Sequence, residues 1–143
     1  MVSYRPASFC CFCGYGPNTL WNGHKSCRWR YGCFKVYNGP VEKIRLADLD
    51  TPERDQPWGT EATTALRQWS MSKPARIEVV DTDRYGRLVA TLWVDDENIN
   101  RRLVEEGHAW VYRKYLRDTS LIKLETRAKS TRTGLWSSND VIK

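Results

Sequence analysis

The stretch Arg45–Glu53, RLADLDTPE, contains the residue types needed to cleave a phosphodiester bond. That reaction needs an electrophilic metal on a phosphate oxygen, a base that takes a proton from water, and cations that stabilise the transition state. Asp50, at the end of an expected strand, offers a hard oxygen ligand for Ca²⁺ or Mg²⁺, and the Thr51 backbone carbonyl offers a second. Glu53 follows a turn stiffened by Pro52, where it can act as general base on a metal-held water.

Two arginines complete this chemistry. Arg45 precedes Asp50 on the expected strand, and Arg87 closes the turn RYGR. Each guanidinium can hold two phosphate oxygens in a fork, which lysine cannot match. The same letters also fit a plainer interpretation, since D-T-P-E is typical of a turn that starts a helix, with a capping Asp and Pro at the first helical position. Asp48 is expected to cap a loop or to be solvated.

The order of elements follows from hydrophobic periodicity and turn signals. Residues 36–46 predict two short strands around an Asn-Gly turn, and residues 59–70 predict a helix. Two strands, a short helix ended by Gly107, an extended segment over residues 108–115 and a last helix ended by Gly134 follow. The inventory is α+β, and it fits a five-stranded OB-fold β-barrel with three helices.

Charge and cysteine divide the chain near Phe34. The net charge is +6, yet residues 1–34 hold four Lys/Arg and no acidic residue, and all five cysteines lie in this part. The remainder is nearly balanced, so specific arginines rather than bulk charge must bind nucleic acid. We therefore divide the chain into an atypical segment (1–34), a folded domain (35–137) and a short tail (138–143). The longest apolar runs fall short of the roughly 18 residues of a membrane span, so no membrane partner is expected.

Four motifs, in one order and spacing, resemble the staphylococcal nuclease-like (thermonuclease) family: IRLADLDTPE, DTDRYGRL, NRRLVEEGHAWVY and GLW. The resemblance implies an OB-fold nuclease, monomeric and secreted or periplasmic, that hydrolyses DNA and RNA with Ca²⁺. It implies these roles: phosphate binding by Arg45 and Arg87, calcium ligation by Asp50 and Thr51, general base catalysis by Glu53, and lining of the nucleotide pocket by Tyr112.

One family motif is missing. Members carry Asp-Gly-Asp-Thr before the hairpin, and its second Asp is a further calcium carboxylate, whereas no acid precedes Glu42 here. Reading the DNA one base later turns RWRY (residues 28–31) into Asp-Gly-Asp-Thr for suitable codons. The same shift turns the upstream cysteine-rich stretch into an apolar segment typical of a secretory signal. We therefore expect residues 5–34 to be an out-of-frame translation, with no intact signal peptide in the chain as written.

Two alternatives stay open at this point. Cys10-x-x-Cys13 and His24-x-x-Cys27 also have the spacing of a four-ligand zinc site, which would make the first segment a nucleic-acid-binding extension. Without the second carboxylate, the chain also fits a non-catalytic OB-fold module that binds nucleic acid and leaves it intact.

Overall fold

The computed structural model describes residues 2–3, 7–9, 33–35, 41–70 and 73–138. The predicted α+β class is confirmed by nine strands and three α-helices. The strands are β1 (Val2–Ser3), β2 (Ala7–Phe9), β3 (Cys33–Lys35), β4 (Val41–Leu46), β5 (Leu49–Asp50), β6 (Pro74–Thr82), β7 (Leu88–Val94), β8 (Glu97–Asn98) and β9 (Trp110–Val111). The helices are α1 (Gly59–Ser70), α2 (Ile99–Glu105) and α3 (Ser120–Ser130), with 3₁₀ turns η2 (Arg113–Tyr115) and η3 (Gly134–Ser137).

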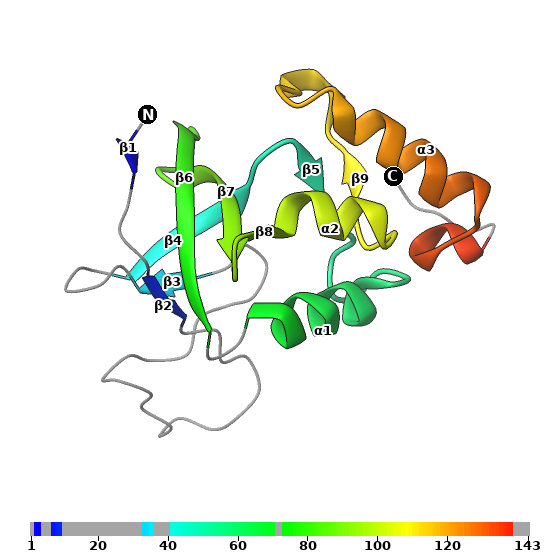
Figure 1. The fold of residues 1–143 in the computed structure, drawn as a ribbon, viewed down its shortest axis with the longest axis horizontal. Helices are drawn as coiled ribbons and strands as arrows, with labels where there is room; N and C mark the ends of the chain where they lie inside the picture. Colours follow the sequence, from blue (N-terminus) through cyan, green and yellow to red (C-terminus); the bar gives the residue numbers. More distant parts are fainter. Residues whose placement is uncertain (1, 4–6, 10–32, 36–40, 71–72, 139–143) are drawn as a thin grey trace.

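The seven strands of the large sheet follow the order β1-β6-β2-β3-β4-β7-β8, with β6 also paired to β7. The pairing of β4 with β7 is parallel, whereas β6 and β7 form an antiparallel hairpin with a register shift between Val79 and Asp81. A second, two-stranded sheet pairs β5 with β9. The three helices lie together on one side of the large sheet, and β9 runs beside α3 (Figure 1).

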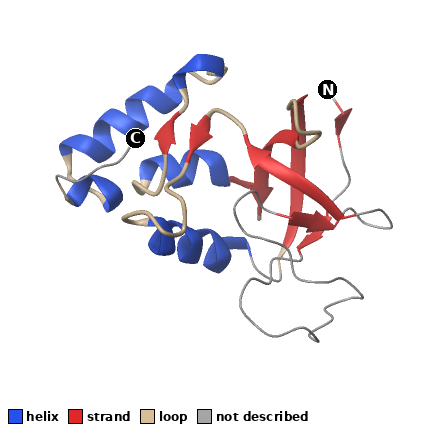
Figure 2. Cartoon of the chain, turned by 180° about the vertical axis from the view of Figure 1, so that it is seen from behind, coloured by secondary structure: helices blue, strands red, loops and turns tan. Residues whose placement is uncertain are grey.

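The core joins the large sheet to the helices, and the view from behind shows the helices together on one side of the strands (Figure 2). Ile77 and Leu92 face inward from β6 and β7, and Leu103 and Val104 meet them from α2. Alternation along the strands and the 3.6-residue period of α2 bring these apolar side chains to one face each. The buried face of α1 includes Ala62, Ala65 and Leu66, as its periodicity predicts, and also Gly59 and Ser70 at its two ends.

Gly107 ends α2 as predicted, and the structure adds the cap at the other end. The Asn98 side chain caps the first turn by accepting a hydrogen bond from the Arg101 N–H. At the other end Gly107 has φ +70°, its N–H donates to the Val104 carbonyl, and the His108 N–H donates to the Leu103 carbonyl. This pair of bonds is the Schellman motif, in which a left-handed glycine ends a helix.

Some boundaries differ from the predictions. The predicted extended segment over residues 108–115 is a strand only at Trp110–Val111 and then tightens into η2. The last helix ends at Ser130, not at Gly134, which instead begins η3. The Asn-Gly turn, residues 28–31 and the four proposed zinc ligands lie outside the described residues. The closed five-stranded barrel stays a prediction.

In the part of the chain that the structure describes, every helix is too short or too polar to cross a membrane.

Candidate active site

A pocket of about 910 Å³ opens where the β4–β5 connection, the β6–β7 turn and the segment after β9 meet. Its volume is within the range usual for small-molecule and cofactor sites. Its wall contains every site residue predicted from the sequence: Arg45, Asp50, Thr51, Glu53, Arg87 and Tyr112. Residues that span 68 positions of the chain thus share one concave surface.

The parallel pairing of β4 with β7 brings the two arginines to this wall. Arg45 lies opposite Val89 in the register, and Arg87 comes two residues before Val89. Side chains alternate along a strand, so positions two apart point to the same face. Arg45 and Arg87 therefore lie on one face of neighbouring strands, although 42 positions separate them.

Arg87 is held by a carboxylate that the sequence analysis did not single out. Asp83 Oδ2 accepts hydrogen bonds from Arg87 Nε and lies 2.5 Å from Arg87 Nη2, and both side chains are largely buried. Asp83 Oδ1 accepts from the backbone N–H groups of Tyr85 and Arg87, at 2.9 and 3.0 Å. Burial raises the pKa of Asp83, but the hydrogen bonds from Arg87 and Tyr85 outweigh it and leave the pKa below its ordinary value. The charged Asp83 thus fixes both the turn and the guanidinium.

A local sequence pattern could have indicated the role of Asp83 in this turn. An Asp three residues before Gly86, whose φ is +73°, is a typical start for a turn that its own side chain closes. The turn expected at Tyr85-Gly86 is confirmed, whereas the role of Asp83 was not predicted.

Aromatic rings surround the arginines. The Arg45 guanidinium lies 5.0 Å from the Tyr112 ring centroid, and Tyr112 lies 5.9 Å from Tyr115. Tyr85 and Tyr115 are the large apolar side chains most exposed in the described part of the chain, at 67% and 64%. Both line the pocket, but neither was predicted. Exposed rings beside cations are surfaces on which nucleotide bases can stack.

The predicted metal ligands lie at the end of β5. Asp50 is exposed, pairs with Trp110 across the small sheet, and accepts a hydrogen bond from the Thr51 N–H at 3.1 Å. Within the described residues there is no group of three or more His, Cys, Asp or Glu side chains arranged to hold a metal. Calcium takes six to eight oxygens. The donors that the structure describes therefore fit only part of a calcium shell.

The predicted base, Glu53, begins a tight turn that leads into α1. Gln56 Oε1 accepts a hydrogen bond from the Glu53 N–H at 2.7 Å, and the Gln56 N–H donates to the Glu53 carbonyl at 2.9 Å. Gly59, the first residue of α1, lies so close that an added Cβ would be 1.8 Å from the Glu53 carbonyl oxygen. The backbone position of Glu53 is thus set by the start of α1. The plainer interpretation of the D-T-P-E stretch is wrong, because α1 begins only at Gly59, so Asp50 is not its cap and Pro52 is not at its first position. The stretch lines the pocket instead.

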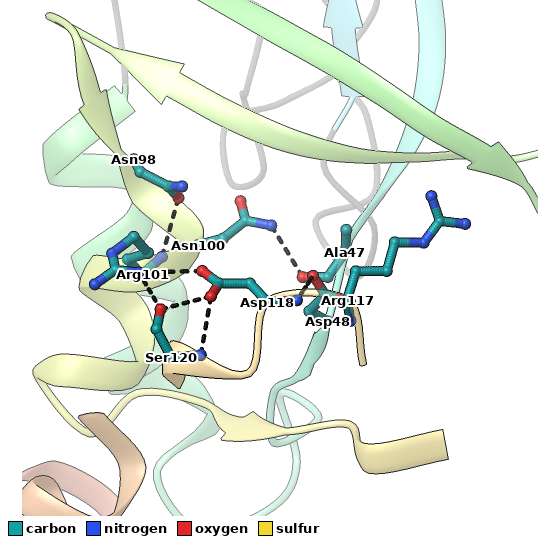
Figure 3. A network of polar contacts seen from close by, with 8 residues as sticks. All are labelled: Ala47, Asp48, Asn98, Asn100, Arg101, Arg117, Asp118 and Ser120. Carbon is teal, nitrogen blue, oxygen red and sulfur yellow. Dashed lines mark hydrogen bonds and ion pairs between the residues drawn. The ribbon is translucent and has the colours of Figure 1, made fainter. Parts of the chain in front are cut away.

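Asp48 holds the connection that leads to Asp50 (Figure 3). It has φ 66°, and its side chain accepts hydrogen bonds from the backbone N–H groups of Arg117 and Asp118, at 2.9 and 3.3 Å. Its carbonyl accepts from the Tyr112 N–H at 2.9 Å. The predicted loop-capping role of Asp48 is confirmed, and the contact ties two walls of the pocket together.

Asn100 supports the same connection from α2. Its side chain is 3% exposed; its Nδ2 donates to the Ala47 carbonyl at 3.0 Å, and its Oδ1 accepts from the Leu92 N–H at 3.0 Å. Figure 3 shows this amide pointing from the helix toward Ala47. A buried amide whose hydrogen bonds are satisfied fixes the distance between a helix and a sheet.

Glu125 fixes the strand that precedes Tyr112 in a similar way. From α3, its carboxylate accepts hydrogen bonds from the Val111 N–H (3.0 Å), Arg113 (2.6 Å) and Lys129 (3.0 Å). Burial raises the pKa of Glu125, but these donors outweigh that effect and hold the pKa below its ordinary value. The strand that leads to Tyr112 is thus fixed by a buried charge.

The structure is a mixed α+β fold in which two arginines, a strand-end aspartate and a glutamate line one pocket. Comparison with known proteins gives a narrower result. The family described as staphylococcal nuclease homologue matches residues 43–138, which contain every predicted site residue. The chain therefore belongs to the staphylococcal nuclease homologue family.

Individual relatives agree. The chain is 38% identical over 106 residues to "Protein ParB" of Escherichia coli, covering 66% of this chain and 60% of that protein. It is 37% identical over 97 residues to the "Probable staphylococcal-like nuclease CAN1" of Oryza sativa subsp. japonica, covering 68% and 29%. It is 33% identical over 100 residues to an "Uncharacterized endonuclease" of Haemophilus influenzae, covering 70% and 56%. The chain spans less than two thirds of the length of each of these relatives.

Proposed function

We propose that this chain is a nuclease that hydrolyses the phosphodiester bonds of DNA and RNA with the help of Ca²⁺. The observation that carries the proposal is the pocket, whose wall joins the predicted base, strand-end carboxylate, arginines and tyrosine. Family membership supports nuclease chemistry in general, and two of the relatives compared are themselves called nuclease or endonuclease.

In the proposed reaction, water attacks phosphorus in line with the bond to the leaving oxygen. Glu53 takes a proton from that water as the new P–O bond forms and the P–O bond to the leaving sugar oxygen breaks. Arg45 and Arg87 bind the non-bridging oxygens, whose negative charge grows in the transition state. Asp83 keeps the Arg87 fork in place, which reduces the reorganisation that the reaction requires. Tyr112 and the exposed Tyr115 face the bases.

Calcium is part of the proposal, with Asp50 and the Thr51 carbonyl as its ligands. When bound, such an ion polarises a phosphate oxygen and lowers the pKa of a bound water. These two donors supply only part of a shell, so the described residues favour weak calcium binding.

We propose further that the protein acts as a monomer and belongs to a secreted or periplasmic nuclease lineage. We also propose a closed OB-type barrel of β2, β3, β4, β7 and β6. The support for the barrel is that each of these strands pairs with two others of the set.

The test is cleavage of single-stranded DNA and of RNA by the chain as written, with calcium and then with EDTA. We expect calcium-dependent cleavage that Glu53→Gln lowers by at least about 100-fold, since general bases contribute 10²- to 10⁴-fold. A matched control, Glu105→Gln, changes an exposed acid at the end of α2, away from the pocket. Cleavage that survives Glu53→Gln would contradict the assigned base.

A second candidate function follows from the incomplete donor set: a module that binds nucleic acid and does not cut it. It predicts binding of labelled single-stranded DNA that weakens with salt and with Arg45→Ala, with no cleavage at any calcium concentration. Cleavage by the wild-type chain that EDTA removes would exclude this candidate.

A further inference from the structure

A cluster behind the pocket joins the turn of Glu53 to the end of α2. Trp58, the residue before α1, donates a hydrogen bond from its indole Nε1–H to His108 Nδ1 at 3.1 Å. The two rings are stacked, with centroids 6.1 Å apart and planes 25° apart. Trp69, from the last turn of α1, packs edge-on against the same imidazole at 5.6 Å. None of these three residues has a role in the reaction proposed above.

The backbone at Trp58 is held in an uncommon conformation. Its φ is 68°, which costs a bulky side chain of order 1–3 kcal/mol and persists when surrounding contacts over-determine it. The Trp58 carbonyl accepts from the Ala62 N–H in the first turn of α1, and the Gly59 N–H donates to the Gln56 carbonyl at 3.0 Å. The turn from Glu53 to Gly59 is therefore closed by short-range bonds at each end, and its Trp58 side chain extends to α2.

Backbone hydrogen bonds hold His108 in place. The Schellman motif that ends α2 places it, because its own N–H donates to the Leu103 carbonyl at 2.7 Å. The preceding Gly107 carbonyl accepts from the Leu135 N–H at 2.8 Å, which locks this turn against η3. A side chain on this turn is thus tied to the core of the domain.

We propose that Trp58 and His108 are positioning residues for Glu53: their hydrogen bond holds the Glu53–Gly59 turn against α2, and protonation of His108 at Nδ1 releases it. The bond needs a lone pair on Nδ1, which neutral imidazole has and imidazolium lacks. The inference rests on the proposed function, in which Glu53 is the base. Because Glu53 is fixed through its backbone to Gly59, a loosened Trp58 displaces the turn that presents its carboxylate.

Burial and neighbouring acidic residues have opposite effects on the pKa of His108. Burial lowers its pKa, while Glu106, at the end of α2, and Glu61, in the first turn of α1, raise it; the net pKa lies below the ordinary value. The Arg102 guanidinium lies over the Trp69 ring, 4.2 Å from its centroid, and forms ion pairs with Glu97 and Glu106. His108 is therefore neutral at pH 7, and the bond to Trp58 is intact.

Three variants separate the hydrogen bond from packing. Trp58→Phe keeps a ring and removes the donor. His108→Leu keeps bulk and removes the acceptor. His108→Asn places Oδ1 at the same number of bonds from Cβ as Nδ1, so it keeps an acceptor that does not titrate near neutral pH.

The first readout is amide hydrogen exchange at Gln56 and Gly59, with Leu92 in β7 as the control for global stability. At pH 7 we expect exchange at Gln56 and Gly59 to be about tenfold faster in Trp58→Phe and His108→Leu, with Leu92 unchanged and His108→Asn close to wild type. As pH falls below 6.5 and through the lowered pKa of His108, wild type should lose protection at these two amides relative to His108→Asn. Unchanged exchange in Trp58→Phe and His108→Leu, or a His108→Asn protein that behaves like His108→Leu, would overturn the proposal.

The second readout is cleavage kinetics. Displacing a base lowers kcat rather than substrate binding, so we expect a 10- to 100-fold lower kcat with little change in KM for Trp58→Phe and His108→Leu, and rescue by His108→Asn. A change confined to KM would overturn the positioning role. If wild type cleaves nothing while the Gln56 and Gly59 amides respond as described, the positioning contact stands and the proposed nuclease function fails.

Discussion

At the scale of single residues, the guanidinium of Arg87 is fixed by Asp83, which contacts it at two nitrogen atoms, and in the proposed reaction this contact preorganises Arg87 for phosphate. Such a pair differs from a surface salt bridge, because both side chains are largely buried and the carboxylate also closes its own turn. The value of Asp83 should therefore appear in catalysis as well as in stability.

Replacing Arg87 tests this directly. We expect Arg87→Lys to lower kcat/KM by about 100-fold, since lysine cannot form the bidentate fork, and Asp83→Asn to lower it by about tenfold through a looser Arg87. Steady-state cleavage of a short single-stranded DNA measures both. The matched control is Arg127→Lys on α3, an arginine whose side chain is 74% exposed and lies outside the pocket. Equal losses in Arg87→Lys and Arg127→Lys, which both keep the positive charge, would contradict a specific role of the Arg87 fork.

At the scale of elements, the site depends on how α2 holds the β4–β5 connection. Asn100 links Ala47, Ala90 and Leu92, which belong to that connection and to β7. The residue two positions earlier, Asn98, has a different task as the cap of α2. Asn98 is partly exposed and caps the helix, whereas Asn100 is buried and binds backbone groups of the sheet and the β4–β5 connection.

The two asparagines provide a matched pair for stability. We expect Asn98→Ala to lower the free energy of unfolding by about 1 kcal/mol, the usual cost of a lost cap. Asn100→Ala should cost more, about 2–4 kcal/mol, because it leaves buried backbone groups without partners. Urea unfolding at pH 7 measures both values. Equal costs would mean that water replaces the Asn100 side chain.

Glycines at turns supply a second comparison at this scale. Gly86 and Gly107 both have positive φ, but a Cβ on Gly86 meets open space while one on Gly107 would lie 2.3 Å from the Thr133 carbonyl oxygen. Gly86→Ala should therefore cost about 1–2 kcal/mol, from the backbone conformation alone. Gly107→Ala should cost about 3 kcal/mol or more, because η3 must also move away. Thermal unfolding of both variants checks the difference, and similar melting temperatures would show that the contact with η3 yields easily.

At the scale of the whole molecule, the buried Glu125 and the half-buried His108 connect stability to pH. The pKa of Glu125 is lower in the folded state than its ordinary value of 4.5, so its contribution is complete above that pH and is lost as pH falls through the folded pKa. The pKa of His108 is lowered from 6.5, so the unfolded chain takes up its proton first and stability begins to fall below pH 6.5. Acid should thus weaken the fold in two stages.

Glu125→Gln tests the lower stage. We expect it to reduce the free energy of unfolding by about 1.5–3 kcal/mol at pH 7, because charge-assisted hydrogen bonds to Arg113 and Lys129 are lost. The difference from wild type should shrink as pH falls below 4.5. Urea titrations at several pH values measure it, and a difference that stays constant with pH would mean that Glu125 is not charged in the folded protein.

The missing metal motif is also a property of the whole chain, since residues 28–31 precede every described part of the site. If this segment derives from a shifted frame, replacing RWRY by Asp-Gly-Asp-Thr should add a carboxylate to the calcium shell. We expect tighter calcium binding by calorimetry and a gain in calcium-dependent cleavage. Asn-Gly-Asn-Thr at the same positions is the control without charge, and equal calcium affinity in the two replacements would contradict the hypothesis.

The sequence by itself determined the α+β class, the end of α2 at Gly107, and a set of residues that the structure finds around one pocket. These follow from local rules: periodicity, the left-handed glycine at position 107, and the pairing of carboxylates with arginines. Local rules also supported the interpretation of Asp48 as a loop cap, although its partners at Arg117 and Asp118 are distant in the chain.

The tertiary structure alone decided which residues meet. The parallel pairing of β4 with β7 brings Arg45 and Arg87 to one pocket wall, whereas the contact of Asp83 with Arg87 is local to the β6–β7 turn. The contact between Trp58 and His108 bridges 50 positions and leaves no periodic pattern in the sequence. Such contacts depend on the packing of α1 against α2, which is a property of the whole core and not of any short stretch of residues.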